Sequence, residues 1–196
     1  MRRTTLTALL MAGALALTAC ASDSAASEGA GDAGGNGGEE GSQNDHDHGD
    51  PVTAEPLTQR HEFADSISVS IGIQPDGRDE HVVQLDDASR IAVAEITVAP
   101  GGRFPWHTHP GPALAAVTSN ELIYIYADDC VERSYPAGTA FVDPGGDNIH
   151  TAYNPSTTEE TTVMVTFLGA PEEGPLTLPV DDDEGAALDT QCAVDF

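Results

Sequence analysis

The chain contains no lysine: all seven of its basic residues are arginine, and they face 33 acidic residues. The formal net charge is -26 at pH 7. Binding to nucleic acid needs a surface rich in Lys and Arg that neutralises phosphates, so this composition argues against a nucleic-acid partner. It argues equally against electrostatic attachment to anionic lipid headgroups. A strongly acidic exterior keeps a protein soluble but does not say which partners it has.

Long hydrophobic runs are also missing. The apolar stretch at residues 6–17 is shorter than the roughly 20 residues that span a bilayer. It follows Arg2 and Arg3 and precedes small residues, an arrangement typical of a secretory signal peptide. The run Leu17-Thr18-Ala19-Cys20 resembles the lipobox of bacterial lipoproteins, in which the cysteine is acylated. This resemblance implies a signal peptide at 1–19, lipidation of Cys20 and a membrane anchor on the extracytoplasmic face; the alternative is an ordinary secretory signal with a chance cysteine.

Cysteine is scarce, with three in the chain. If the anchor uses Cys20, then Cys130 and Cys192 remain as an even pair, and an exported protein meets an oxidising compartment that favours disulfides. A bridge between them closes a loop of about 60 residues, worth about 4 kcal/mol in the chain-entropy model. It also pins the acidic C-terminal tail at 179–196. Two unpaired thiols are the alternative.

The composition divides the chain into a linker and a folded domain. Residues 20–56 are rich in Gly, Ser and acidic side chains and show no apolar period, so we expect a disordered tether. Residues 57–178 consist of short strand-like runs separated by Gly, Pro, Asn and Asp, and no run shows a helical period. The expected strands lie at residues 67–73, 80–85, 91–99, 113–118, 121–126, 131–135, 139–142, 150–153 and 161–168. This pattern predicts an all-β antiparallel sandwich or barrel.

Three of the seven histidines form a candidate metal site. Side chains alternate along a strand, so His107 and His109 point to the same face and can share one divalent ion. His150 opens a later strand, which an antiparallel barrel can bring close to this pair. Two or three converging imidazoles are typical ligands of a transition metal.

Two segments resemble the conserved motifs of the cupin superfamily. The segment from Gly138 to Asn154, GTAFVDPGGDNIHTAYN, resembles the second cupin motif, G(x)5PxG(x)2H(x)3N, at every fixed position. The segment from Gly101 to His109 resembles the first half of motif 1. This similarity implies an antiparallel jelly-roll β-barrel of the cupin, RmlC-like type. It also implies that His107, His109 and His150 are metal ligands inside the barrel.

The resemblance assigns structural roles to other motif residues. Gly138 and Gly146 serve turns that need a positive φ or a close backbone approach. Pro144 stiffens the entry to the strand that bears His150. Asn154 lies four residues after His150 and so can face the same side of that strand. Cupins also often pair through sheet edges, which implies a homodimer.

The chain departs from motif 1 at the position of a fourth ligand. Cupins usually carry a glutamate there, but this chain has Ala113 and Leu114, which cannot bind a metal. The closing glycine of the motif is replaced by Asn120, which accepts left-handed backbone geometry. A site of three neutral histidines suits Zn²⁺, Fe²⁺, Cu²⁺ or Ni²⁺ better than the hard ion Mn²⁺.

The sequence leaves the activity open because cupins include oxygenases, isomerases and pure binding proteins. The first hypothesis is an exported, lipid-anchored, metal-binding protein that acts on or senses a small molecule. The alternative is a non-catalytic ligand-binding or accessory lipoprotein whose metal site is structural or vestigial.

Overall fold

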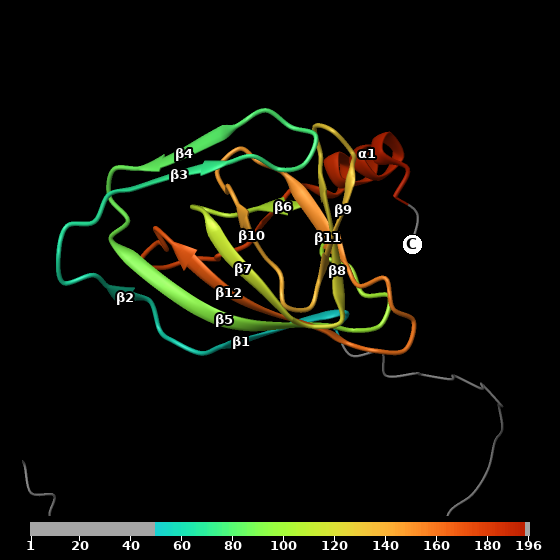
Figure 1. Cartoon of the computed structure of the whole chain (residues 1–196), viewed down its shortest axis with the longest axis horizontal. Coiled ribbons are helices and arrows are strands. Elements are labelled where there is room, and N and C mark those ends of the chain that lie inside the picture. Colours follow the sequence, from blue (N-terminus) through green and yellow to red (C-terminus); the bar gives the residue numbers. More distant parts are fainter. Residues whose placement is uncertain (1–49, 195–196) are drawn as a thin grey trace, which may run out of the picture. The chain divides into compact units, whose positions relative to one another are not determined.

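The computed structural model describes residues 50–194, in which two antiparallel β-sheets pack face to face (Figure 1). The first sheet has the order β1-β5-β12-β7-β10, and β2 also pairs with β5. Its strands are β1 (Val52–Pro56), β2 (His61–Glu62), β5 (Arg90–Val98), β7 (Ala113–Ser119), β10 (Ala140–Asp143) and β12 (Thr161–Leu168). The second sheet has the order β13-β6-β11-β8-β9. Its strands are β6 (His107–Thr108), β8 (Glu121–Tyr126), β9 (Glu132–Pro136), β11 (His150–Tyr153) and β13 (Leu178–Pro179).

The strand order identifies the topology. Strands β5 to β12 form two four-stranded sets, β5-β12-β7-β10 and β6-β11-β8-β9, so the chain crosses repeatedly between the two sheets. This is the arrangement of a jelly roll. The predicted all-β class and antiparallel jelly-roll barrel are confirmed.

Period-two alternation in the sequence produces the interior between the sheets. On β5 the buried side chains are Ala92, Ala94, Ile96 and Val98, and the residues between them are half-buried. On β7, in the same sheet, two of the buried positions are also alanine, Ala113 and Ala115. Alanine fills less volume than the Val, Leu or Phe usual in a core, so these positions leave room for larger side chains from the opposite sheet.

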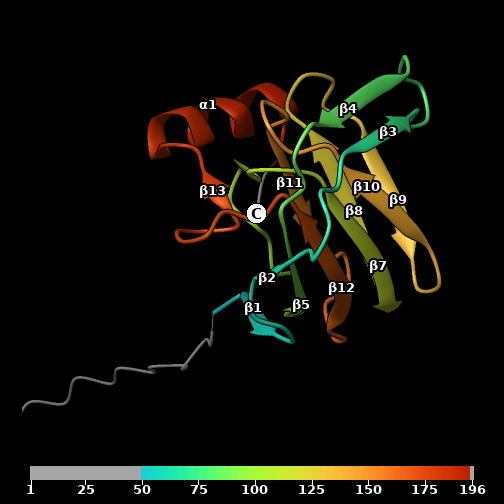
Figure 2. The same ribbon diagram turned by 90° about the vertical axis from the view of Figure 1, so that its left-hand side faces the viewer.

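Strand β8 is buried on both faces, which explains its nearly continuous apolar sequence LIYIY. Leu122, Tyr124 and Tyr126 belong to the cluster between the sheets. Ile123 and Ile125 belong to a second cluster on the outer face, which the C-terminal segment covers. Helix α1 (Asp182–Cys192) supplies part of that cover and lies close to β13 and β11 (Figure 2).

The acidic C-terminal tail at 179–196, for which the sequence pattern indicated no secondary structure, contains helix α1. The helix has no apolar stripe, since none of its eleven residues is buried, so hydrophobic periodicity could not reveal it. Capping holds it instead: the Asp181 side chain accepts a hydrogen bond from the backbone N–H of Glu184, and the first turn is acidic, as the helix dipole favours. The bridge Cys130–Cys192, which the structure contains, ties the last residue of the helix to the turn between β8 and β9.

The folded region also begins earlier than expected. Residues 52–56 were assigned to the tether, but they form β1, which pairs along its whole length with β5 from Val52↔Val98 to Pro56↔Ala94. Its side chains are mostly exposed, so its sequence carries no alternating apolar signal. Backbone hydrogen bonding to a sheet edge orders this segment, which makes the boundary at 56/57 wrong.

Two further segments complete the description. Strands β3 (Val69–Ile73) and β4 (His81–Leu85) form a separate antiparallel hairpin (Figure 1).

Among residues 50–194, no helix is long and apolar enough to cross a membrane. The predicted signal peptide, Cys20 and the tether up to residue 49 lie outside the described residues.

Candidate metal centre

The fold brings the three predicted histidines together. His107 opens β6 and His150 opens β11, and the two residues are direct partners in the antiparallel register. The ring centroids of His107 and His150 are 4.1 Å apart, and that of His109 lies 4.9 Å and 5.2 Å from them. One nitrogen from each ring can be chosen so that all three lie within 4.8 Å of one another. All three side chains are buried.

Each histidine has a backbone carbonyl oxygen next to its Nδ1 atom, and Nδ1 of His150 lies closer still to a carboxylate, Oδ2 of Asp143, at 3.0 Å. Nδ1 of His107 lies 2.7 Å from the Pro105 oxygen, and Nδ1 of His109 lies 2.8 Å from the Leu176 oxygen. Nδ1 of His150 lies 3.4 Å from the Asn148 oxygen. A carbonyl can only accept, so these contacts place the proton on Nδ1 and leave the Nε2 lone pair free. This is the usual orientation of histidines that bind a metal.

His107 in β6 and His109 directly after it are neutral at pH 7. Burial, assisted by the neighbouring imidazoles of His150 and His109, lowers the pKa of His107 to about 2. Burial also lowers the pKa of His109. A neutral imidazole keeps the lone pair that a metal requires, so the protonation state fits a metal ligand.

A buried carboxylate, Asp143, stands beside these rings, and the sequence reasoning did not identify it. Its Oδ2 atom lies 3.0 Å from Nδ1 of His150 and 3.8 Å from Nε2 of His109. The hydroxyl of Tyr124 donates to the same oxygen at 2.7 Å. The backbone N–H of Gly145 donates to Oδ1 at 2.6 Å.

Asp143 is ionised despite its burial. Burial by itself raises the pKa of this carboxyl, but its electrostatic interaction and hydrogen bond with His150, followed by the influence of His109 and the Tyr124 hydroxyl, lower the pKa below its ordinary value. Burial, followed by the Asp143 charge, raises the pKa of Tyr124 well above its usual range, so its hydroxyl remains a donor. A signal for Asp143 was present in the sequence: it shares the inward-facing alternation of Phe141, directly before Pro144.

A small cavity of about 70 Å³ adjoins the three histidines and Asp143. Most of its other walls are apolar and come from both sheets. The phenylalanines give it shape, because Phe104 stacks near His107 with centroids 5.5 Å apart and Phe167 meets His109 edge-on at 5.3 Å. On its other side, the ring of Tyr124 stacks on His150 at 4.7 Å.

The remaining motif residues have structural positions. Asn120, Gly138 and Gly146 have φ values of 55°, 88° and 62°, so each adopts the left-handed backbone that the resemblance predicted. Pro144 immediately follows the last residue of β10. Asn154 is buried away from the cavity, where its amide donates to the backbone oxygens of Val98, Ala99 and Glu159.

The structure shows where Ala113 and Leu114 lie, the two residues that stand in place of the usual glutamate ligand. Ala113 lines the cavity, whereas Leu114 points outward and is 40% exposed. The β7–β10 register sets Ala113 directly opposite Asp143. A carboxylate is therefore present at this level of the barrel, but it comes from the neighbouring strand.

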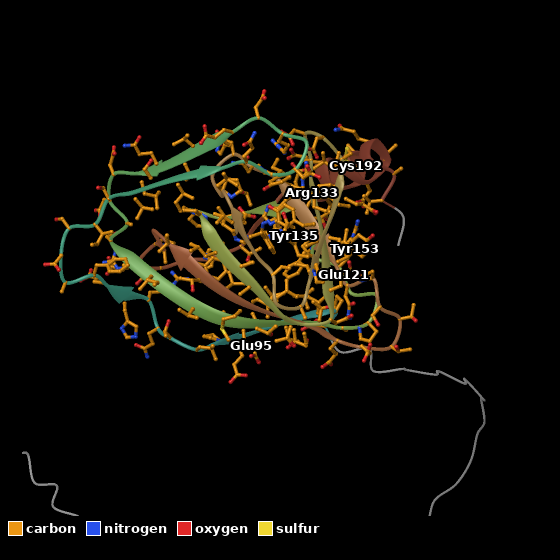
Figure 3. All side chains as sticks on the ribbon, in the orientation of Figure 1. Glu95, Glu121, Arg133, Tyr135, Tyr153 and Cys192 are labelled. Carbon is orange, nitrogen blue, oxygen red and sulfur yellow. A yellow bond between two sulfur atoms is a disulfide. The ribbon has the colours of Figure 1, made fainter. Side chains whose placement is uncertain are left out.

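Other polar residues lie away from the cavity. Glu95 projects from the outer side of the first sheet (Figure 3). Arg133, on β9 in the same view, is buried and bonds to Asp129 with distances of 2.8 Å and 3.1 Å. Its side chain and that of Arg78 both lie against the ring of Tyr126.

No protein-family model and no curated protein matches the chain. Solved structures do resemble it. One is an RmlC-like cupin from Shewanella frigidimarina, with 18% identity and a TM-score of 0.42 over 64% of this chain and 83% of that one. A polyketide cyclase from Streptomyces resistomycificus has 21% identity and a TM-score of 0.42, covering 71% of this chain and 87% of that one.

A cupin-like protein from Thermotoga maritima has 22% identity and a TM-score of 0.39, covering 50% of this chain and 72% of that one. The jelly-roll assignment itself rests on the strand order of this chain. Cupin-like proteins are among the solved structures that resemble it.

Proposed function

We propose that this chain is an exported, lipid-anchored protein whose β-barrel holds one divalent transition-metal ion through His107, His109 and His150, and that it acts on or senses a small molecule there. The observation that carries the proposal is the convergence of the three buried rings: one nitrogen from each lies within 4.8 Å of the others. Nδ1 of His107 and of His109 contacts a backbone carbonyl, and Nδ1 of His150 lies 3.0 Å from Oδ2 of Asp143 and 3.4 Å from the Asn148 oxygen, so each ring has an acceptor on its Nδ1 side.

The donor set fits such an ion. Three imidazole ligands suit Zn²⁺, Fe²⁺, Cu²⁺ or Ni²⁺, and a site with three protein ligands retains an open position. An ion bound there supplies Lewis acidity towards a small molecule. Phe104 packs against the ring of His107 and Phe167 against that of His109. A buried group of three imidazoles without such a role is a costly way to fill a core.

The size and lining of the cavity favour a small, weakly polar molecule. Apart from the three histidines, the cavity of about 70 Å³ has apolar walls interrupted by Asp143, Tyr124 and Thr177. A larger hollow of about 500 Å³ lies outside it between β5 and residues 175–177. Ile96, Phe167 and Thr177 line both spaces, which supports an approach to the histidines from that side.

The metal proposal is tested by metal content. The full-length chain, purified in mild detergent without chelators, is expected to carry close to one divalent ion per chain by elemental analysis. His107→Ala removes one of three ligands and is expected to abolish this binding, whereas His61→Ala, at an exposed position on β2, leaves it unchanged. Wild-type protein that stays metal-free after reconstitution contradicts the proposal.

The anchor proposal rests on the lipobox-like run ending at Cys20. Several acyl chains, at about 0.8 kcal/mol per buried methylene, hold a protein on the membrane almost permanently. Wild-type protein is expected to incorporate labelled fatty acid and to fractionate with membranes, and Cys20→Ala is expected to lose both properties. Equal membrane association and no labelling of either form contradict a lipid anchor.

A non-catalytic binding or accessory lipoprotein is the second candidate, and the small volume of the cavity favours it. About 70 Å³ leaves room for few atoms beside an ion. The two candidates differ in whether the bound ion has exchangeable water. Water-proton relaxation of Cu²⁺-loaded protein distinguishes them: enhancement supports an accessible site, and its absence supports a structural ion.

A further inference from the structure

Asp143 carries out two separate tasks with its two carboxylate oxygens. Oδ1 accepts the N–H of Gly145 and thereby fixes the turn between β10 and β11. Oδ2 takes no part in that turn. It faces Nδ1 of His150 at 3.0 Å, Nε2 of His109 at 3.8 Å and the hydroxyl of Tyr124 at 2.7 Å. A residue needed only for the turn would have no reason to place its second oxygen among the histidines.

The surroundings of Oδ2 make this placement costly without a counter-charge. The Asp143 side chain is buried, with 3% of its surface exposed. Among the side chains that line the cavity, it is the only carboxylate and no Arg is present, so His150 and His109 are its only ion-pair partners there, and each carries a charge only when protonated. An uncompensated buried charge costs several kcal/mol, whereas a cation held by the adjacent histidines offsets it.

We propose that Asp143 is the carboxylate of the metal centre, acting as a positioning residue: it orients the ring of His150 and supplies the negative charge that strengthens cation binding by the three histidines. This inference rests on the proposed metal site. A carboxylate in contact with a ligating histidine fixes the ring and raises its basicity. The geometry points to this role because Oδ2 lies within hydrogen-bond distance of Nδ1 of His150, at 3.0 Å, but lies farther, at 3.8 Å, from Nε2 of His109.

Tyr124 offers a matched control. It touches the same oxygen and stacks on His150, yet it carries no charge at neutral pH. Tyr124→Phe removes one hydrogen bond from Oδ2 and keeps the carboxylate, whereas Asp143→Asn removes the charge and keeps the shape. Asn can still accept the Gly145 N–H through its amide oxygen. Asp143→Ser is a second charge-free variant that places no amide against His150.

The experiment measures Zn²⁺ affinity by competition titration in full-length wild type and in the three variants, with the melting temperature of each in chelator as the folding control. Asp143→Asn and Asp143→Ser are expected to weaken Zn²⁺ binding by about 10- to 100-fold. Tyr124→Phe is expected to lose less Zn²⁺ affinity than either Asp143 variant. The visible absorption bands of bound Co²⁺ are expected to shift in the Asp143 variants, since the His150 ring is no longer oriented.

Three results overturn the inference. Folded Asp143 variants that bind Zn²⁺ within twofold of wild type, with an unchanged Co²⁺ spectrum, remove the role of the carboxylate while leaving the metal site intact. A loss in Tyr124→Phe as large as that in Asp143→Asn assigns the effect to the hydrogen bond instead of the charge. Wild type that binds neither ion overturns the proposed metal site itself, and the inference with it.

Discussion

At the scale of single residues, the barrel interior is defined by polar side chains in an apolar surrounding. A buried polar group costs free energy unless it is hydrogen-bonded. His107 and His109 meet this requirement through a backbone carbonyl at Nδ1, and His150 meets it at Nδ1 through Asp143 and the Asn148 carbonyl. The Nε2 atoms of these histidines are the ones available to bind a metal. Burial also lowers the pKa of His107 and of His109, which makes the stability of the folded protein sensitive to pH.

Acidification is expected to destabilise the metal-free protein. In the unfolded chain a histidine takes up a proton near pH 6.5, but in the folded chain the lowered pKa values keep His107 and His109 neutral. Their contribution is complete above pH 6.5 and is lost as the pH falls towards the folded pKa. Below pH 6.5, the free energy of unfolding falls by about 1.4 kcal/mol per pH unit for each histidine that stays neutral in the folded state.

Urea unfolding in chelator at pH 7, 6 and 5 measures this slope. His107→Gln is expected to reduce the slope by about 1.4 kcal/mol per pH unit relative to wild type. His61→Gln, at an exposed position, is expected to leave it unchanged. Identical slopes in wild type and His107→Gln contradict the burial of a neutral imidazole.

Sequence pattern predicted the histidines but missed the carboxylate. Spacing alone puts His107 and His109 on one face, and the motif resemblance identified His150. Asp143 occupies a variable position of that motif and depends on the register that sets β10 against β7. Strand pairing is a long-range property, so a single strand could not indicate that Asp143 lies opposite Ala113 and beside the histidines.

At the scale of elements, the outer helix supports the strand that bears the first two histidines. The Asp189 carboxylate on α1 accepts from Arg103 at 2.6 Å and from the indole N–H of Trp106 at 2.7 Å. Trp106 directly precedes His107 and points to the opposite face, as alternation predicted. Helix α1 therefore fixes the backbone from which the ligands project.

Asp189→Ala is expected to lower the free energy of unfolding by about 1–3 kcal/mol, because it leaves the buried indole N–H and the Arg103 guanidinium without this acceptor. Urea denaturation measures the loss. Thr190→Ala, at the exposed neighbouring position, is the control and is expected to change stability by less than about 0.5 kcal/mol. Equal stabilities of the two variants contradict a supporting role for α1.

The elements themselves were predictable to different degrees. Runs such as 91–99 and 161–168 alternate or are strongly apolar and became β5 and β12. Strand β1 and helix α1 have mostly exposed side chains and are stabilised by sheet-edge hydrogen bonds, caps and a disulfide. None of these leaves an apolar period in the sequence, which is why both were missed.

At the scale of the whole molecule, one covalent link joins the C-terminal helix to the second sheet. The bridge Cys130–Cys192 spans 62 residues, and that stretch includes His150 and the turn fixed by Asp143. Cross-linking such a loop reduces the entropy of the unfolded chain by about 4 kcal/mol in free-energy terms.

The double variant Cys130→Ser/Cys192→Ser is expected to lose about 4 kcal/mol of stability while keeping the β-sheet circular dichroism of the wild type. Wild type treated with reductant in urea is expected to unfold at the same denaturant concentration as the double variant. Stability that is insensitive to both changes contradicts a structural role for the bridge.

The most direct test of the metal centre is a crystal structure of the protein reconstituted with Zn²⁺, with diffraction data collected at the zinc absorption edge. The account predicts one anomalous peak inside the barrel, about 2.0–2.1 Å from Nε2 of His107, His109 and His150, with Asp143 against the Nδ1 side of His150. A barrel without a peak, or a peak held by other residues, contradicts it.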